Sequence, residues 1–369
     1  MTDARAEVFN TGARVAAARI ALARLDQADA AADRLADAID PEALHDFRVA
    51  VRRLRSTLRN FRGELDDEIP KKLRTRLREV TRATTPARDD EVLSDWVKDL
   101  ARTIPAGRRG GITWFRRRLG RRRKGAYAEI REKILPRFRK LDRRIRKSLT
   151  PLVEEQDAEI AQPTYGIVLA TIISEHTTAL RDELSTYNSP ADDPAGHRAR
   201  IVIKRLRYLL EPLEESDPAA AALIPRLKEL QDALGAVHDL QILAGEIAVG
   251  VTDAASERAR EQHERILDPE TAEQSPRKGP RAATSGLLAL ARLIHETRQQ
   301  RFDQFVAEWR TEKIPQLLHD CAALATALSG AATGSPAAPS PIPGDSPADD
   351  DLPQPSEPPA RTDDTPAVT

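Results

Sequence analysis

The sequence predicts an all-α protein built from two related antiparallel helical bundles. Hydrophobic residues make up 40% of the 369-residue chain, but aromatic residues make up only 4%. This composition suits helices rich in Leu and Ala better than an aromatic-rich β core. Apolar residues recur at helical spacing in the long segments, and one basic helical segment occurs twice, which indicates an internal repeat.

The repeated segment combines an apolar helical face with a cationic one. At about 100° per residue, the first copy places one histidine and four arginines on one arc, with apolar residues on the neighbouring arc. The pattern His-x-x-Arg-(Val/Ile)-x-x-(Arg/Lys)-Arg-Leu-Arg returns later in the chain, because His197 follows His45 by 152 positions. The two copies are expected to bring their basic faces to one shared groove. The basic residues are His45, Arg48, Arg52, Arg53, Arg55 and Arg59 in the first copy and His197, Arg200, Lys204, Arg205 and Arg207 in the second.

The first half, about residues 1–150, is predicted to be helical throughout. The expected elements are an amphipathic helix over 3–40, the basic helix over 44–62, a helix over 70–84, a short helix over 89–100 and a helical hairpin that starts at Gly111. Gly120, Gly125 and Pro136 are expected to interrupt the hairpin. In the first helix the predicted buried positions are Ile20, Leu22, Leu25, Leu35 and Ile39.

The second half, about residues 160–330, repeats this order. An apolar helix over 164–184 matches the N-terminal helix, and the second basic helix follows it. A further stretch matches at an offset of 150, with Asp239 corresponding to Asp89, and the last segment matches at an offset of 175, with Gly286 corresponding to Gly111. The extra length is assigned to a flexible insertion at about 268–285, which is rich in Pro, Gly, Ser and charged residues.

The net charge of zero conceals a basic body and an acidic tail. Residues 331–369 contain seven carboxylates and one arginine, so residues 1–330 carry a net charge of +6. The tail is rich in Pro, Ala, Ser, Thr and Asp and is predicted to be disordered. Within the body, residues 108–147 contain eighteen Lys or Arg and three acids, an excess that attracts polyanions.

The doubled basic pattern resembles the CHAD family, the conserved histidine α-helical domain, over most of residues 1–330. The resemblance implies halves of the four-helix type and a role in binding inorganic polyphosphate through the repeated basic residues. The chemistry of arginine agrees independently, because its planar fork meets phosphate oxygens two at a time. Glu211 departs from the pattern, since it stands where the first copy has Arg59, and it is expected to weaken that end of the second stripe.

Other basic residues are weaker candidates, because charge runs are usually solvated helix faces. A histidine near a helix start is more often hydrogen-bonded to structure than used in catalysis, so a ligand role for His45 and His197 is favoured only modestly. The remaining four histidines, apart from His238, and the three tryptophans are assigned to structure. The weaker candidates are Arg88, Arg117, Arg121, Arg123, His238, Arg292 and Arg298.

The sequence favours a binding protein over an enzyme. It contains no Gly-rich phosphate loop, no Cys/His set with zinc spacing, and no Glu-x-Glu-x-Lys motif of the triphosphate-processing CYTH domain that often accompanies CHAD. No catalytic residue, metal or cofactor is therefore predicted. The alternative is a helical nucleic-acid-binding protein, although the basic arcs lack interleaved aromatics for base stacking.

The expected location is the cytoplasm, with association with polyphosphate granules as a further expectation. The chain has one cysteine, Cys321, no basic and apolar leader at its start, and no apolar run of about 20 residues. A membrane partner is not expected. The acidic tail is a third element to consider, as a mild internal competitor for the basic groove.

Overall fold

The structure is a computed structural model that describes residues 8–36, 40, 42–154, 163–267 and 281–331. Within these ranges the regular elements are helices, and the β-type pairing is confined to one isolated bridge. The predicted all-α fold is confirmed. The first half contains α2 (Ala13–Ala36), α3 (Ala43–Asn60), α4 (Arg62–Leu65), α5 (Lys71–Leu100), α6 (Arg109–Glu129) and α7 (Leu135–Glu154). The second half contains α8 (Tyr165–Thr186), α9 (Asp193–Leu210), α10 (Pro218–Leu267), α12 (Arg281–Glu308) and α13 (Ile314–Ala331).

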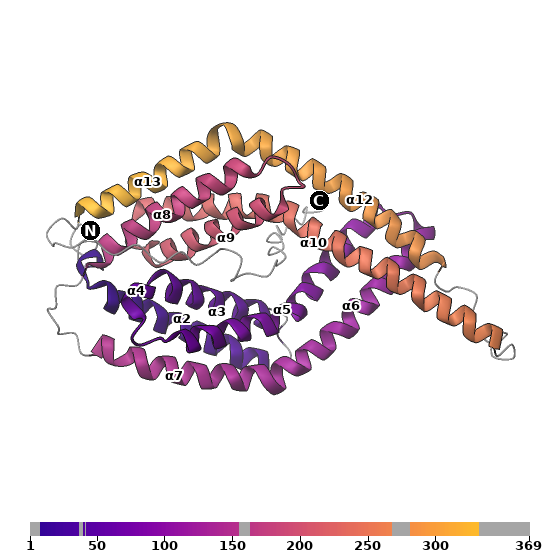
Figure 1. Cartoon of the computed structure of the whole chain (residues 1–369), viewed down its shortest axis with the longest axis horizontal. Coiled ribbons are helices and arrows are strands. Elements are labelled where there is room, and N and C mark those ends of the chain that lie inside the picture. The colour runs from indigo at the N-terminus through magenta and orange to yellow at the C-terminus, as the bar shows by residue number, and fades with distance from the viewer. Residues whose placement is uncertain (1–7, 37–39, 41, 155–162, 268–280, 332–369) are drawn as a thin grey trace, which may run out of the picture.

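Four long helices pack together in each half. In the first half α2 contacts α3 and α7, and α5 packs on α3 and α7. In the second half α9 lies between α8 and α10, and α13 packs on α8 and α10 (Figure 1). One continuous hydrophobic core runs through both groups. The observed packing is thus of the helical-bundle type in both halves.

A second, smaller core joins the halves at the other end of the molecule. It forms where the end of α5, α6, the middle of α10 and the start of α12 meet, on the right of Figure 1. Leu93, Phe115, Leu243 and Leu287 are almost fully buried there. Since α6 comes from the first half and α12 from the second, this core belongs to both.

Corresponding residues of the two halves touch at both ends of the molecule. Near the start of each half, Gly12 forms the isolated bridge with Thr164, and the amide of Tyr165 donates to the carbonyl of Thr11 at 2.8 Å. At the other end Gly111 of α6 packs directly against Gly286 of α12. A Cβ atom on Gly111 would lie 2.2 Å from the carbonyl oxygen of Ala283, so this close approach requires glycine.

The core of α2 is built from alanine more than from the predicted Leu and Ile positions. Leu25 and Leu35 are buried as predicted, but Ile20 and Leu22 are only partly buried, and Ile39 lies outside the described residues. Small side chains let α2 approach its neighbours closely. The buried alanines of α2 are Ala13, Ala16, Ala17, Ala18, Ala21, Ala28, Ala31 and Ala32. The prediction of one unbroken helix is wrong, because residues 8–10 are helical but the chain leaves the helix at Thr11 and Gly12, and α2 begins only at Ala13.

Two predicted breaks do not exist. Residues 71–100 form the single helix α5, with Pro86 inside it, where a gap between two helices was expected. The expected hairpin after Gly111 is instead one long helical rod of α6, a π turn (Ile130–Ile134) and α7, and neither Gly120 nor Gly125 interrupts it. Glycine destabilises a helix but does not forbid one. The packing of α6 and α7 against neighbouring helices outweighs the cost of Gly120 and Gly125.

In each half a π turn lies just before a proline within the helical segment. The amide of Leu135 donates to Ile130, five residues back, and Pro136 follows directly; in the second half Ile314 donates to Trp309 and Pro315 follows. Proline has no N–H to donate, so a local change of helical register at this point loses no available donor. Residues 281–285, predicted to belong to the insertion, are the first turn of α12. Residues 268–280 and the tail from 332 lie outside the described ranges.

Of the helices described, α10 alone has a length and hydropathy compatible with a membrane span, over Pro218–Glu264. Half of its apolar window is buried inside the protein, and a buried core helix passes the same test. Leu223, Leu227, Leu230 and Leu234 of this helix are buried in the main core.

The glycine contact at the junction of α6 and α12 generates the first prediction. Gly111→Ala should lower the free energy of unfolding by about 1–3 kcal/mol, because a Cβ there overpacks two backbones. Gly120→Ala, where nothing lies within 4 Å of an added Cβ, should be neutral or stabilising by up to about 1 kcal/mol. Chemical denaturation of the two variants measures the difference, and equal stability would contradict the close packing of α6 against α12.

Candidate functional site

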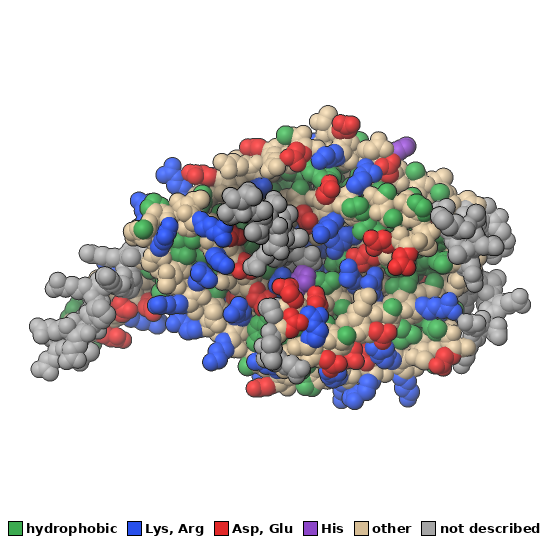
Figure 2. Space-filling model, turned by 180° about the vertical axis from the view of Figure 1, so that it is seen from behind, with side chains coloured by type: hydrophobic (Ala, Val, Ile, Leu, Met, Phe, Trp, Pro, Cys, Tyr) green, Lys and Arg blue, Asp and Glu red, His purple; other side chains and the backbone are tan. Residues whose placement is uncertain are grey.

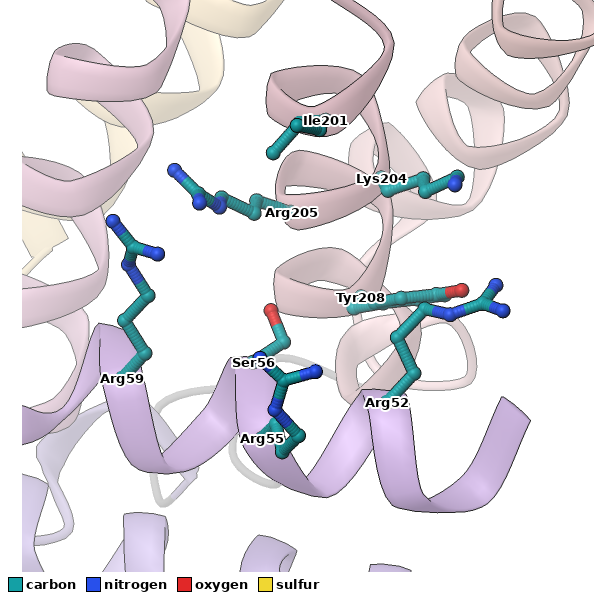
Figure 3. A pocket seen from close by; sticks show the side chains of 8 residues that line it. All are labelled: Arg52, Arg55, Ser56, Arg59, Ile201, Lys204, Arg205 and Tyr208. Carbon is teal, nitrogen blue, oxygen red and sulfur yellow. The ribbon is translucent and has the colours of Figure 1, made fainter. Parts of the chain in front are cut away.

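A groove between α3 and α9 is lined by five cationic side chains (Figure 3). Arg52, Arg55 and Arg59 come from α3, and Lys204 and Arg205 come from α9. Figure 3 shows Arg59 and Arg205 on one side of the groove and Arg52 and Lys204 on the other. The other described lining residues are Ser56, Ile201 and Tyr208, so none of the described lining residues is a carboxylate.

Helical periodicity explains why the α3 cations face one way. Phe47, Val51, Leu54 and Leu58 recur every three or four residues and are at most 2% exposed, which fixes the packed face of α3. The groove arginines lie on the adjacent face and are partly exposed. The amphipathic pattern of this helix therefore explains which face carries these cations.

Arg48, predicted to bind ligand, is buried and is not among the groove-lining residues. Its Nη1 donates to the carbonyl oxygen of Thr81 at 3.1 Å and to the hydroxyls of Thr84 at 2.7 Å and Thr85 at 3.2 Å. Burial lowers the pKa of Arg48 to about 9, and the neighbouring positive charge of Arg52 acts in the same direction. The three threonines of α5 were not identified from the sequence.

Arg200 occupies the corresponding place in the second half. It is 2% exposed, and its Nη1 lies 3.9 Å from a carboxylate oxygen of Asp239, which is 1% exposed. Asp89, the residue that corresponds to Asp239 in the repeat, acts on Arg48 in the first half. Each half thus places a buried arginine of the basic helix near an aspartate of the following long helix, which is partly buried in the first half and fully buried in the second. The repeat at an offset of 150 contained the signal for these aspartates, but their link to the basic helices required the structure.

Glu211, just after the end of α9, forms ion pairs with three arginines. Arg53 Nε lies 2.7 Å from Oε2, Arg24 Nη2 lies 3.2 Å from Oε2, and Arg207 Nε lies 3.6 Å from Oε1. Burial lowers the pKa of Arg24, and the charge of Glu211 opposes this shift. Three positive charges therefore surround one negative charge. Two of the predicted ligand residues, Arg53 and Arg207, point to this carboxylate.

Comparison with known proteins identifies the family. The family model described as the CHAD domain matches residues 19–248, which is more than half of the chain. The chain belongs to the CHAD family. The resemblance seen in the sequence is thereby confirmed. No curated protein matches the sequence.

The CHAD fold is also seen in two similar solved structures. A crystal structure of the CHAD domain from the plant Ricinus communis has a TM-score of 0.54 at 19% identity and covers 85% of this chain and 92% of that chain. PptA from Streptomyces chartreusis has a TM-score of 0.52 at 16% identity and covers 84% of this chain and 99% of that chain. At these identities the likeness concerns the fold alone.

The histidines of this CHAD chain lie outside the described groove lining. The rings of His197 and His238 are 4.6 Å apart between centroids, and Nδ1 of His238 is 2.9 Å from a carboxylate oxygen of Asp193. His45 is half-buried in the first turn of α3. The structure therefore brings two predicted histidines together. Their pairing beside Asp193 at the start of α9 supports an orienting role for that helix.

His176 lies near the Arg59 and Arg205 side of the groove. Desolvation lowers its pKa to about 3, and the positive charges of these two arginines contribute to the shift. Its Nε2 is 3.3 Å from the amide oxygen of Asn60. His176 is neutral at physiological pH, in keeping with the structural role predicted for it.

The weaker candidates do not line the groove. Arg88 pairs with Glu91 at 3.1 Å and Arg292 with Glu296 at 2.9 Å, while Arg298 is half-buried on α12. The other three arginines among the weaker candidates are exposed on α6. They are Arg117, Arg121 and Arg123. Figure 2 shows that Lys and Arg side chains mix with Asp and Glu over one face of the molecule, so positive charge alone does not mark the site.

A carboxylate cluster missed in the sequence lies between α5 and α10. Arg122 bridges Asp90 at 2.9 Å and Glu246 at 2.8 Å. Burial raises the pKa of Asp89 to about 7, against the opposing charge of Arg48, and raises that of Asp90 to about 6, against the opposing charge of Arg122. Among the residues that the structure describes, no group of three or more His, Cys, Asp or Glu side chains could hold a metal ion.

These raised pKa values predict a pH dependence of stability. In an unfolded chain both carboxyls titrate near 3.9, so the folded protein holds these protons more tightly. Their contribution is fully present below about pH 4 and is lost as the pH rises to about 7. Asp89→Asn should flatten the fall in melting temperature between pH 5 and pH 8. The exposed Asp95→Asn on the same helix is the matched control and should keep the wild-type slope; equal slopes for both variants would contradict this account.

Proposed function

We propose that this CHAD protein binds inorganic polyphosphate in the groove between α3 and α9, without turning it over. The observation that carries the proposal is the convergence of Arg52, Arg55 and Arg59 from one repeat with Lys204 and Arg205 from the other. A linear chain of phosphates requires closely spaced donors along a groove, and arginine supplies them in pairs.

The shape of the site favours polyphosphate over nucleic acid. Tyr208 is the single aromatic among the described lining residues, and it is 5% exposed. A buried ring offers no stacking platform to successive bases, which is how single strands are usually held. The groove also lies between two packed helices, whereas a recognition helix must project into a duplex groove. Nucleic acid remains the second candidate and is the natural competitor in a binding assay.

The predicted ligand residues divide into those that line the groove and those that do not. Five of the eleven strongest candidates line it, and we propose these five as the direct contacts. Arg48, Arg200 and Arg207 are at most 5% exposed, and Arg53 is held by Glu211. We propose that these four hold the groove residues in place and add to the positive potential. In the cell we expect the protein in the cytoplasm, at polyphosphate granules.

Charge reversal in the groove tests the proposal. The double variant Arg52→Glu with Lys204→Glu should weaken polyphosphate binding by about 100-fold or more near 0.1 M salt. The magnitude of the negative slope of log affinity against log salt should decrease by about two, because two phosphate contacts are lost. Fluorescence anisotropy with labelled polyphosphate, competed by unlabelled polyphosphate, RNA and DNA, measures both quantities. Tighter competition by RNA or DNA than by polyphosphate would favour the second candidate.

Two further double variants serve as controls for folding and for non-specific charge effects. Lys204 is only 9% exposed, so Arg52→Gln with Arg205→Gln provides a milder double change, and circular dichroism checks that the helices persist. The matched control is Arg117→Glu with Arg121→Glu, which reverses two exposed charges on α6. The control should change affinity by less than about twofold because salt screens distant charges. If the control weakened binding as much as the groove variant, the site would lie elsewhere.

A further inference from the structure

Two hydroxyl groups line the groove without a hydrogen-bond partner among the described residues. They belong to Ser56 of α3 and Tyr208 of α9, and both oxygen atoms are buried. In Figure 3 the Ser56 hydroxyl points from α3 toward α9, and the Tyr208 ring extends from α9 toward the end of the Arg52 side chain. Buried hydroxyls are normally satisfied, so each exception needs an explanation.

The two hydroxyls occupy corresponding positions in the repeat. Tyr208 follows Ser56 by 152 positions, the same interval that separates His197 from His45. The halves therefore place one neutral hydroxyl each at the same step of the basic helix, although the side chains differ in size. Both residues belong to the groove lining, together with the five cations.

Neighbouring residues show that Ser56 could have been satisfied locally. A hydroxyl within a helix commonly donates to the carbonyl one turn back. The adjacent Thr57 does so, with its Oγ1 3.2 Å from the carbonyl oxygen of Arg53, and Thr81 donates to Leu77 at 3.1 Å. Ser56 has no such bond in the described structure. Its hydroxyl thus retains a hydrogen that a bound acceptor can use.

Two arginines lie over the Tyr208 ring. The guanidinium carbon of Arg207 lies 5.1 Å from the ring centroid and that of Arg53 lies 5.7 Å from it. Both arginines are in turn paired with Glu211. These cation–π contacts fix the ring, and with it the hydroxyl, in the groove. Glu211, which stands where the first repeat has Arg59, thus holds the two arginines that fix the Tyr208 ring.

We propose that Ser56 and Tyr208 donate neutral hydrogen bonds to phosphate oxygens of a polymer bound by the surrounding cations. This inference rests on the proposed function and extends it to two uncharged residues. Phosphate oxygens accept hydrogen bonds, and a hydroxyl that lacks a partner in the free protein gains one when the ligand binds. The two hydroxyls supply a part of the affinity that does not depend on salt, because no counterion is released when a neutral donor binds.

The test separates neutral donors from charged ones by salt dependence. Tyr208→Phe and Ser56→Ala should each weaken polyphosphate binding by about five- to thirtyfold at a fixed salt concentration. The slope of log affinity against log salt should stay at the wild-type value. Arg52→Gln, measured alongside, should instead reduce that slope by about one. Melting temperatures of all variants show whether the fold is retained.

Tyr165→Phe is the matched control. Its hydroxyl is also buried without a partner among the described residues, but it lies at the start of α8, where it lines a separate small cavity and not the groove. The control should bind polyphosphate as the wild type does. Unchanged affinity in Tyr208→Phe and Ser56→Ala would overturn the inference, and so would a reduced salt slope, which would mean that they act by placing cations. If the wild type itself did not bind polyphosphate, the proposed function would fail first.

Discussion

Mutual repulsion among the groove cations is the constraint on which this structure depends. Two unit charges about 6 Å apart repel by roughly 2–3 kcal/mol at the effective dielectric of a protein surface. Five cations on α3 and α9 therefore oppose the packing of these helices. The protein compensates with carboxylates paired to other arginines of the same region: Glu211 pairs with Arg24, Arg53 and Arg207, and Asp239 lies beside Arg200. None of these carboxylates is among the described groove-lining residues, so the groove itself stays cationic.

The same arrangement explains why several basic residues of the repeated pattern are buried. Arg48 uses its guanidinium to bind the Thr81 carbonyl and two threonine hydroxyls of α5, which ties the basic helix to the helix behind it. Its pKa is lowered by burial to about 9 but stays above physiological pH, so Arg48 keeps its positive charge. Buried arginines of this kind add positive potential to the region around the groove. The contacts of Gly12 with Thr164 and of Gly111 with Gly286 fix the two halves against each other at both ends.

The helical periodicity and the internal repeat were enough to predict the all-α fold, the basic helices and the helices that form the groove. They could not predict which residues of a basic arc are buried, because the same arc includes both Arg48, which is buried, and Arg52, which lines the groove. Pro86 and Gly120 suggested breaks in the sequence, but tertiary packing overrides such local preferences in long helices. The pairing of Glu211 with Arg24 joins residues 187 positions apart and has no local signal. Ser56 and Tyr208 are uncharged, so the basic pattern of the sequence carries no signal for them.

The central claim is that the two repeats share one ligand groove, formed by α3 and α9. A crystal structure of the protein with a short polyphosphate tests it most directly. We expect phosphates between the two helices, with oxygens within about 3 Å of Arg52, Arg55, Lys204 and Arg205. Phosphates bound instead along the exposed arginines of α6, with the groove between α3 and α9 empty, would contradict it.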